Sequence, residues 1–228
     1  MRITRRLALA SATAVLAIWT IAFPTAAANP RIAVVQGMPG KTVDVCLGNA
    51  EIKSGLRYGK WVQKVVAPGT YTMRFRTASP GRCQGSVLGK TIFAVSADHD
   101  ITFVGKAKGA DFVWFHNTDV PKPMGDVDWV GFRHAADVGP IALNVWGMNM
   151  AVPAAVPTFD VGDRWQVSIG GPYSAAYTFS VYKPTALTPF EGPKGYLTTS
   201  GRRHEIYLVG TNTRNARFAA VVRPTIAP

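Results

Sequence analysis

The chain has 228 residues, of which 47% are hydrophobic and 17% charged, and this composition indicates a folded protein and excludes a disordered one. The formal net charge is +12, which favours anionic partners over cationic ones. Alternatively, the basic side chains are spread over the surface and serve solubility.

Residues 1–28 have the three parts of a secretory signal peptide. Met1–Arg6 is basic, Leu7–Phe23 is uncharged and mostly apolar, and Ala26–Ala28 is a small-x-small cleavage site. We predict cleavage after Ala28 and a secreted, extracellular or cell-envelope protein. An uncleaved membrane anchor is the alternative, because the apolar run is close to the lower limit of about 17–25 residues for a spanning helix.

Export bears on whether the two cysteines form a disulfide. In an oxidising compartment Cys46 and Cys83 are predicted to form a disulfide, worth about 4 kcal/mol on the loop-entropy model. Two free buried thiols are the alternative.

Alternating apolar and polar residues predict the first set of strands. These are Arg31–Val35, Lys41–Leu47, Trp61–Val66, Tyr71–Arg76, Thr91–Val95, Ile101–Val104 and Asp111–His116. Asn49–Gly59 has weak periodicity and is expected to be irregular. Ala78–Gly89, rich in Gly, Ser and Pro, is expected to be a loop that carries Cys83.

Pro68-Gly69 predicts a turn that joins two of these strands into a β-hairpin. Beyond the turn, Tyr71, Met73 and Phe75 share one face, and polar residues share the other. With this pairing, one outer face carries a candidate basic binding face, formed by Lys64, Arg74 and Arg76. The same charges are also typical of a sheet edge protected against aggregation.

The second half of the chain repeats the order of the first. Ile206-Tyr207-Leu208-Val209-Gly210 matches Ile101-Thr102-Phe103-Val104-Gly105, and four other segments match in order at a spacing of roughly one hundred residues. We therefore predict an all-β protein of two tandem immunoglobulin-like antiparallel β-sandwich domains after an N-terminal signal helix. The first domain spans 29–120, a linker spans 121–126, and the second domain spans 127–228.

These segments resemble a domain-of-unknown-function family of secreted bacterial tandem β-sandwich repeats. Its motifs run V-R-V-V-H-A-S-P-D-A-P, V-D-V-Y-V, Y-G and V-P-A-G-T-Y-T-V-R-V. The matching residues are Val43–Leu47, Tyr58-Gly59 and Val66–Phe75 in the first repeat, and His134–Asp137 in the second. The resemblance implies the fold, export and tandem arrangement, and the family brings no agreed activity with it.

The sequence predicts no catalytic, cofactor-binding or metal-binding residue. It lacks a G-x-S-x-G turn, and His99 between Asp98 and Asp100 is read as part of a turn between strands. A calcium site at Asp126 and Asp128 would have two of the six to eight donors that such sites use.

Five tryptophans of the mature chain raise the question of a stacking surface for carbohydrate or lipid: Trp61, Trp114, Trp129, Trp146 and Trp165. Core packing is the expected role for most of them. Trp146 stands where Cys46 stands in the first repeat, so we predict that it fills the core in place of the disulfide.

The predicted function is that of a secreted, non-enzymatic β-sandwich protein of the bacterial cell envelope that binds an anionic or glycan surface component. A membrane-anchored interaction or sensing ectodomain that contacts a protein partner is the alternative. A secreted hydrolase built on His99 is a third reading. No nucleic acid partner is predicted, and no cofactor.

Overall fold

The computed structural model describes residues 29–97, 99–106, 112–117, 128–147, 154–169, 176–197 and 202–224. All regular structure in these ranges is β-strand, as predicted. The first eight strands are β1 (Arg31–Gln36), β2 (Thr42–Leu47), β3 (Ala50–Arg57), β4 (Trp61–Val65), β5 (Gly69–Thr77), β6 (Val87–Val95), β7 (Asp100–Gly105) and β8 (Phe112–His116). The other eight are β9 (Asp128–His134), β10 (Ile141–Gly147), β11 (Ala154–Phe159), β12 (Arg164–Ile169), β13 (Ala176–Tyr182), β14 (Glu191–Leu197), β15 (Arg202–Val209) and β16 (Arg217–Pro224).

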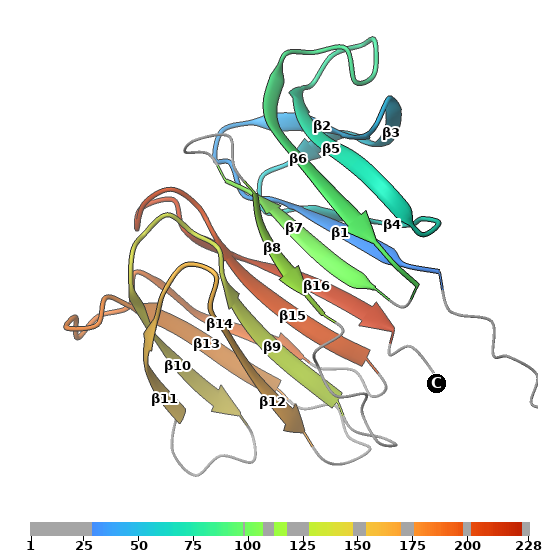
Figure 1. Ribbon diagram of the computed structural model, residues 1–228. Helices are drawn as coiled ribbons and strands as arrows, with labels where there is room; N and C mark the ends of the chain where they lie inside the picture. The colour runs from blue at the N-terminus through green and yellow to red at the C-terminus, as the bar shows by residue number, and fades with distance from the viewer. Residues whose placement is uncertain are drawn as a thin grey trace, which may run out of the picture.

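The strands form four sheets in two β-sandwiches with the same strand order (Figure 1). Sandwich one has the sheets β4-β1-β7-β8 and β3-β2-β5-β6, and sandwich two has β12-β9-β15-β16 and β11-β10-β13-β14. Each has one parallel pair, β1 with β7 and β9 with β15, and its other pairs are antiparallel. The chain is therefore two tandem immunoglobulin-like sandwiches, and the repeated topology fits the repeated sequence.

Each sandwich encloses its own apolar core, which forms because every second strand residue points inward. On β5, Met73 and Phe75 are buried in the core of sandwich one, as the alternation predicts. On β13, Tyr177 and Phe179 take the corresponding places in sandwich two. The opposite faces of these two strands belong to the outer sides of the two sandwiches.

Two sequence predictions about strands are wrong. Residues 50–57 form strand β3 and are not irregular; their alternation is broken by Gly55, which has a φ of 61° where the register between β2 and β3 shifts. Pro68-Gly69 does not close a hairpin, because β4 pairs with β1 whereas β5 pairs with β2 and β6. The turn instead carries the chain from one sheet of the sandwich to the other.

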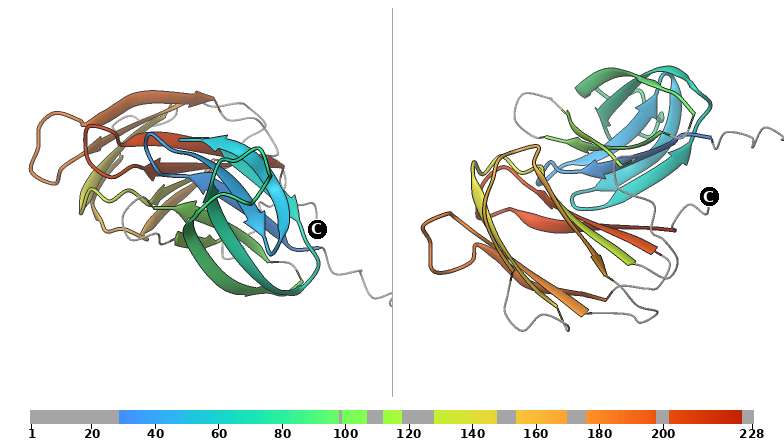
Figure 2. Two further views of the ribbon diagram at one scale, coloured as in Figure 1. Left: turned by 90° about the horizontal axis from the view of Figure 1, so that it is seen from above. Right: turned by 60° about the horizontal axis from the view of Figure 1, so that its bottom comes forward.

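The two sandwiches pack together through their inner sheets, so the molecule is a stack of four sheets (Figures 1 and 2). A third apolar cluster lies between them and includes Val35, Val104 and Phe115 from sandwich one and Tyr207 and Val221 from sandwich two. Both faces of β1, β7 and β15 are thus buried. The sheets that contain β2 and β10 are the outermost layers, at opposite ends of the stack.

Polar groups complete the contact between the sandwiches. Arg133 is buried, with Nη2 3.7 Å from Oε1 of Glu205 and its guanidinium carbon 5.6 Å from the ring centre of Phe115. Burial raises the pKa of Tyr207, and its protonated hydroxyl donates a 2.9 Å hydrogen bond to Glu205. The hydroxyl of Tyr58 donates to the carbonyl oxygen of Val209, at 3.0 Å. Of these contacts, the packing of Arg133 against Phe115 and the hydrogen bond from Tyr58 to Val209 join the two sandwiches, whereas Glu205 holds Arg133 and Tyr207 within sandwich two.

The predicted signal peptide, its cleavage site and the predicted linker at 121–126 lie outside the described residues. These remain predictions, as do the domain limits drawn from them. Among the described residues, no helix is long and apolar enough to cross a membrane.

Candidate functional site

The outer face of sandwich one is covered by the loop between β5 and β6. Cys46 on β2 is joined to Cys83 in this loop, with their Cα atoms 6.0 Å apart, which confirms the predicted disulfide. Cys46 has no exposed surface. Arg82 and Cys83 have φ values of 47° and 53°, a backbone conformation that side chains other than glycine rarely adopt and that here is held by the disulfide.

Asp44, two residues before Cys46, anchors the same loop. Its Oδ1 accepts hydrogen bonds from the hydroxyl of Ser54 at 3.1 Å and the amide of Gly55 at 3.0 Å, and its Oδ2 accepts one from the amide of Ser79 at 3.2 Å. Burial opposes ionisation of this carboxyl, but these hydrogen bonds hold the pKa of Asp44 below its usual value. The Asp44 carboxylate therefore stabilises the fold of sandwich one.

The structure brings two of the three residues of the candidate basic binding face together and separates the third. Arg74 and Arg76 lie on the outer face of β5, whereas Lys64 lies on β4 in the other sheet. Arg74 donates to the carbonyl oxygen of Gly48 at 2.7 Å, and Arg76 donates to that of Gly85 at 2.8 Å. Both arginines thus hold loops in place, and binding of an anion by these residues stays a prediction.

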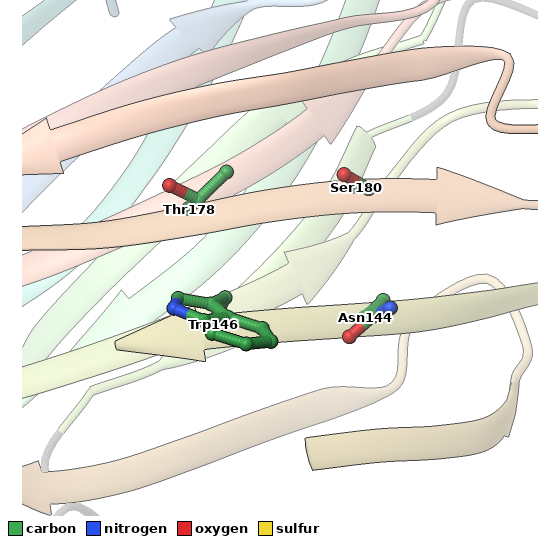
Figure 3. Close-up of a pocket in the computed structure, with 4 residues that line it drawn as sticks. All are labelled: Asn144, Trp146, Thr178 and Ser180. Atoms are coloured by element: carbon green, nitrogen blue, oxygen red, sulfur yellow. The ribbon is translucent and has the colours of Figure 1, made fainter. Parts of the chain in front are cut away.

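The equivalent face of sandwich two carries a pocket of about 270 Å³, lined by Asn144, Trp146, Thr178 and Ser180 (Figure 3). The four residues form two cross-strand pairs between β10 and β13: Asn144 lies opposite Ser180, and Trp146 lies opposite Thr178. Because residues two apart on a strand point to the same side, all four share the outer face. None of them carries a charge.

Trp146 gives the pocket its apolar surface. Its side chain is 50% exposed on the outer face of β10, so the prediction that it fills the core is wrong. The core position next to it is occupied by Val145. A half-exposed tryptophan on the outer face of a sheet offers a broad ring face for stacking. The neighbouring hydroxyl and amide groups offer hydrogen bonds.

The two outer faces correspond residue by residue. Asp44 pairs with Arg76 and Cys46 with Arg74 in sandwich one, where Asn144 pairs with Ser180 and Trp146 with Thr178 in sandwich two. In sandwich one these four places hold three charged residues and a disulfide-bonded cysteine, whereas in sandwich two they hold four neutral residues that line a pocket. Gly195, opposite Thr178 on β14, adds no side chain to the open face.

In the described part of the chain, the ring of His99 is hydrogen-bonded to Ser96. Nε2 of His99 is 2.8 Å from the hydroxyl of Ser96, and Oδ1 of Asp100 accepts a 3.2 Å hydrogen bond from Asn117. Asp98 and Asp126 lie outside the described residues, as does the side chain of Asp128, so neither the full His99 group nor the calcium site is placed. Among the residues that are placed, no three His, Cys, Asp or Glu side chains gather as a metal site would require.

The pocket was not predicted from the sequence, although the pattern of residues 143–146 contains a signal for it. In Leu143-Asn144-Val145-Trp146 the apolar residues Leu143 and Val145 mark the core face, which places Asn144 and Trp146 on the outer face. A large aromatic residue on the polar side of an alternating strand is the feature that indicated a binding surface. The alignment of Trp146 with Cys46, which is buried, led to the wrong expectation that Trp146 fills the core.

Comparisons with known proteins do not assign the chain to a family. No family model matches it, and no curated protein matches it. It is similar to the structure of a family 26 carbohydrate-binding module from Eubacterium rectale Amy13K in complex with maltoheptaose, with 10% identity, a TM-score of 0.26, and coverage of 87% of this chain and 98% of the module. It is also similar to a Bacteroides ovatus protein provisionally assigned to cell adhesion, with 10% identity, a TM-score of 0.21, and coverage of 88% and 99%. At these values neither likeness defines a ligand.

Proposed function

We propose that the protein is a secreted, non-catalytic glycan-binding protein of the bacterial cell envelope, and that it binds sugar on the outer face of sandwich two. The observation that carries the proposal is the exposed indole of Trp146 in a pocket whose other walls are the hydrogen-bonding side chains of Asn144, Thr178 and Ser180. A sugar ring has an apolar face and a rim of hydroxyl groups, and this lining offers a partner to each.

The chemistry of the lining supports binding without catalysis. None of the four side chains gains or loses a proton near neutral pH, so the pocket offers neither a general acid nor a general base. Its volume of about 270 Å³ is slightly below the range of about 300–1,000 Å³ for ligand pockets, which suits a short segment of a longer glycan chain. The disulfide between Cys46 and Cys83 supports the extracellular location, because such bonds persist in oxidising compartments.

Affinity electrophoresis tests this proposal. The chain from Asn29 onward is run through native gels that contain one polysaccharide each, beside a variant with Trp146→Ala. We expect at least one glycan to retard the wild-type protein, and no glycan to retard the variant. Absence of retardation across a broad set of envelope and plant polysaccharides would refute the proposed function.

A further inference from the structure

Asn144 has a buried side-chain oxygen that receives no hydrogen bond from the described part of the chain. The Oδ1 atom is shielded from water. The rest of the side chain lines the pocket beside Ser180 and Trp146 (Figure 3). An unpaired buried amide is costly for a folded protein, so one at a pocket wall needs an explanation.

The matching position in sandwich one supplies the explanation. There Asp44 accepts a hydrogen bond from the amide of Ser79, which belongs to the loop that covers the face. In sandwich two Trp146 is 50% exposed, and the described residues leave a pocket on the β10–β13 face. The covering loop of sandwich one thus occupies the place that a ligand would take in sandwich two, and it shows that this place presents a hydrogen-bond donor to the side chain below.

We propose that Asn144 is the specificity-determining residue of the glycan site, and that its amide binds a hydroxyl group of an uncharged sugar stacked on Trp146. The inference rests on the proposed function and narrows its substrate class. Rotation about the Cβ–Cγ bond, which is soft for asparagine, turns either the oxygen or the nitrogen of the amide toward the pocket. A sugar hydroxyl both donates and accepts, so it fits either orientation.

The charge distribution selects neutral glycans over acidic ones. Among the described residues, no cation lines the pocket. Arg74 and Arg76, which occupy the positions of Thr178 and Ser180 in sandwich one, are hydrogen-bonded to backbone carbonyls at the other end of the stack. A carboxylate or sulfate group brought against Asn144 would lose its water without gaining a counter-charge. The positive net charge of the chain therefore does not decide the ligand of this site.

The test measures affinity and stability together. The wild-type protein is titrated by calorimetry with soluble neutral glucans, xylan and mannan, and with polygalacturonate and dextran sulfate as acidic probes. Asn144→Ala is compared with Asp44→Ala, its counterpart in sandwich one, and with Trp146→Ala. We expect Asn144→Ala to weaken binding of the neutral glycan about tenfold without lowering the Tm, since one net hydrogen bond is lost and no bond within the protein is broken. Asp44→Ala should lower the Tm and leave binding unchanged.

Each outcome decides one point. If the wild-type protein binds no glycan, the proposed function fails. If it binds and Trp146→Ala abolishes binding, but Asn144→Ala binds as tightly as the wild type, the role of Asn144 fails and the proposed function stands. A fall in both Tm and affinity for Asn144→Ala would show a structural role and overturn the inference. Tighter binding of the acidic polymers would overturn the choice of a neutral sugar.

Discussion

Asp44 and Asn144 occupy the same position on matching strands, yet Asp44 accepts three hydrogen bonds from its own sandwich whereas Oδ1 of Asn144 accepts none. The first position is closed by a loop that the disulfide holds, and the second faces a pocket. On the outer face of sandwich one these contacts stabilise the fold, whereas the outer face of sandwich two carries a pocket in which we propose that a ligand binds.

Loss of the disulfide should destabilise sandwich one and spare the binding site. Replacing Cys46 and Cys83 by serine is expected to lower the free energy of unfolding by about 4 kcal/mol, because the unfolded chain regains the entropy of a closed loop. Urea unfolding of the double variant measures this loss. Glycan affinity serves as the control and should not change, since the pocket lies at the other end of the stack.

Removal of Arg133 should weaken the contact between the sandwiches. Arg133→Ala removes one of two cations beside the buried carboxylate of Glu205, and Arg203, with Nη1 4.0 Å from Oε1, remains. Breaking a buried pair completely costs about 3–5 kcal/mol, so the expected loss of stability is at most of that size. Arg133→Met keeps the packing against Phe115 and is expected to cost less when combined with Glu205→Gln, which removes the opposing charge as well. Chemical unfolding compares the single and double variants. An alanine variant as stable as the wild-type protein would contradict the importance of this pair.

His134 should make stability fall in mild acid. Burial lowers the pKa of His134 below its ordinary value of about 6.5, and its Nε2 lies 2.9 Å from the carbonyl oxygen of Gly139. A neutral ring must donate this bond from Nε2. As the pH drops below about 6.5, the unfolded chain takes up a proton that the folded protein resists, so the folded state loses stability.

Thermal unfolding at a series of pH values tests this effect. The Tm of the wild-type protein should decline as the pH is lowered from 7 through the unfolded pKa, with the decline continuing toward the lower folded pKa. His134→Gln keeps a donor at this position and should flatten the curve in that range. Equal pH dependence in both proteins would show that another group titrates. A further decline in stronger acid is expected from Asp44, whose lowered pKa favours the folded state only while the carboxyl is ionised.

The alternation of side chains predicted most strands of sandwich one, but not β3, and it predicted which residues of β5 face the core. Met73 and Phe75 follow that rule, and so do Asn144 and Trp146 on the opposite faces of their strands. Alternation cannot say whether an outer face is covered, because that depends on the path of a distant loop. Cys46 is buried under such a loop, whereas Trp146 in the same place is exposed.

Two other errors have different physical origins, one in tertiary packing and one in local backbone geometry. Pro68-Gly69 has the composition of a hairpin turn, but the two flanking strands belong to facing sheets, and only tertiary packing distinguishes this arch from a hairpin. Because the arch places β4 and β5 in different sheets, Lys64 is separated from Arg74 and Arg76. In β3, the bulge at Gly55 disturbs the alternation that a regular strand would show.

The most direct measurement is the affinity of two tryptophan variants for the same glycan. Trp146 and Trp114 are almost equally exposed, at 50% and 53%, but Trp114 lies on β8 of sandwich one, away from the pocket. By calorimetric titration, Trp146→Ala should lose measurable binding while Trp114→Ala keeps wild-type affinity and both proteins remain folded. Unchanged affinity in the Trp146 variant would contradict the assignment of the pocket on sandwich two as the binding site.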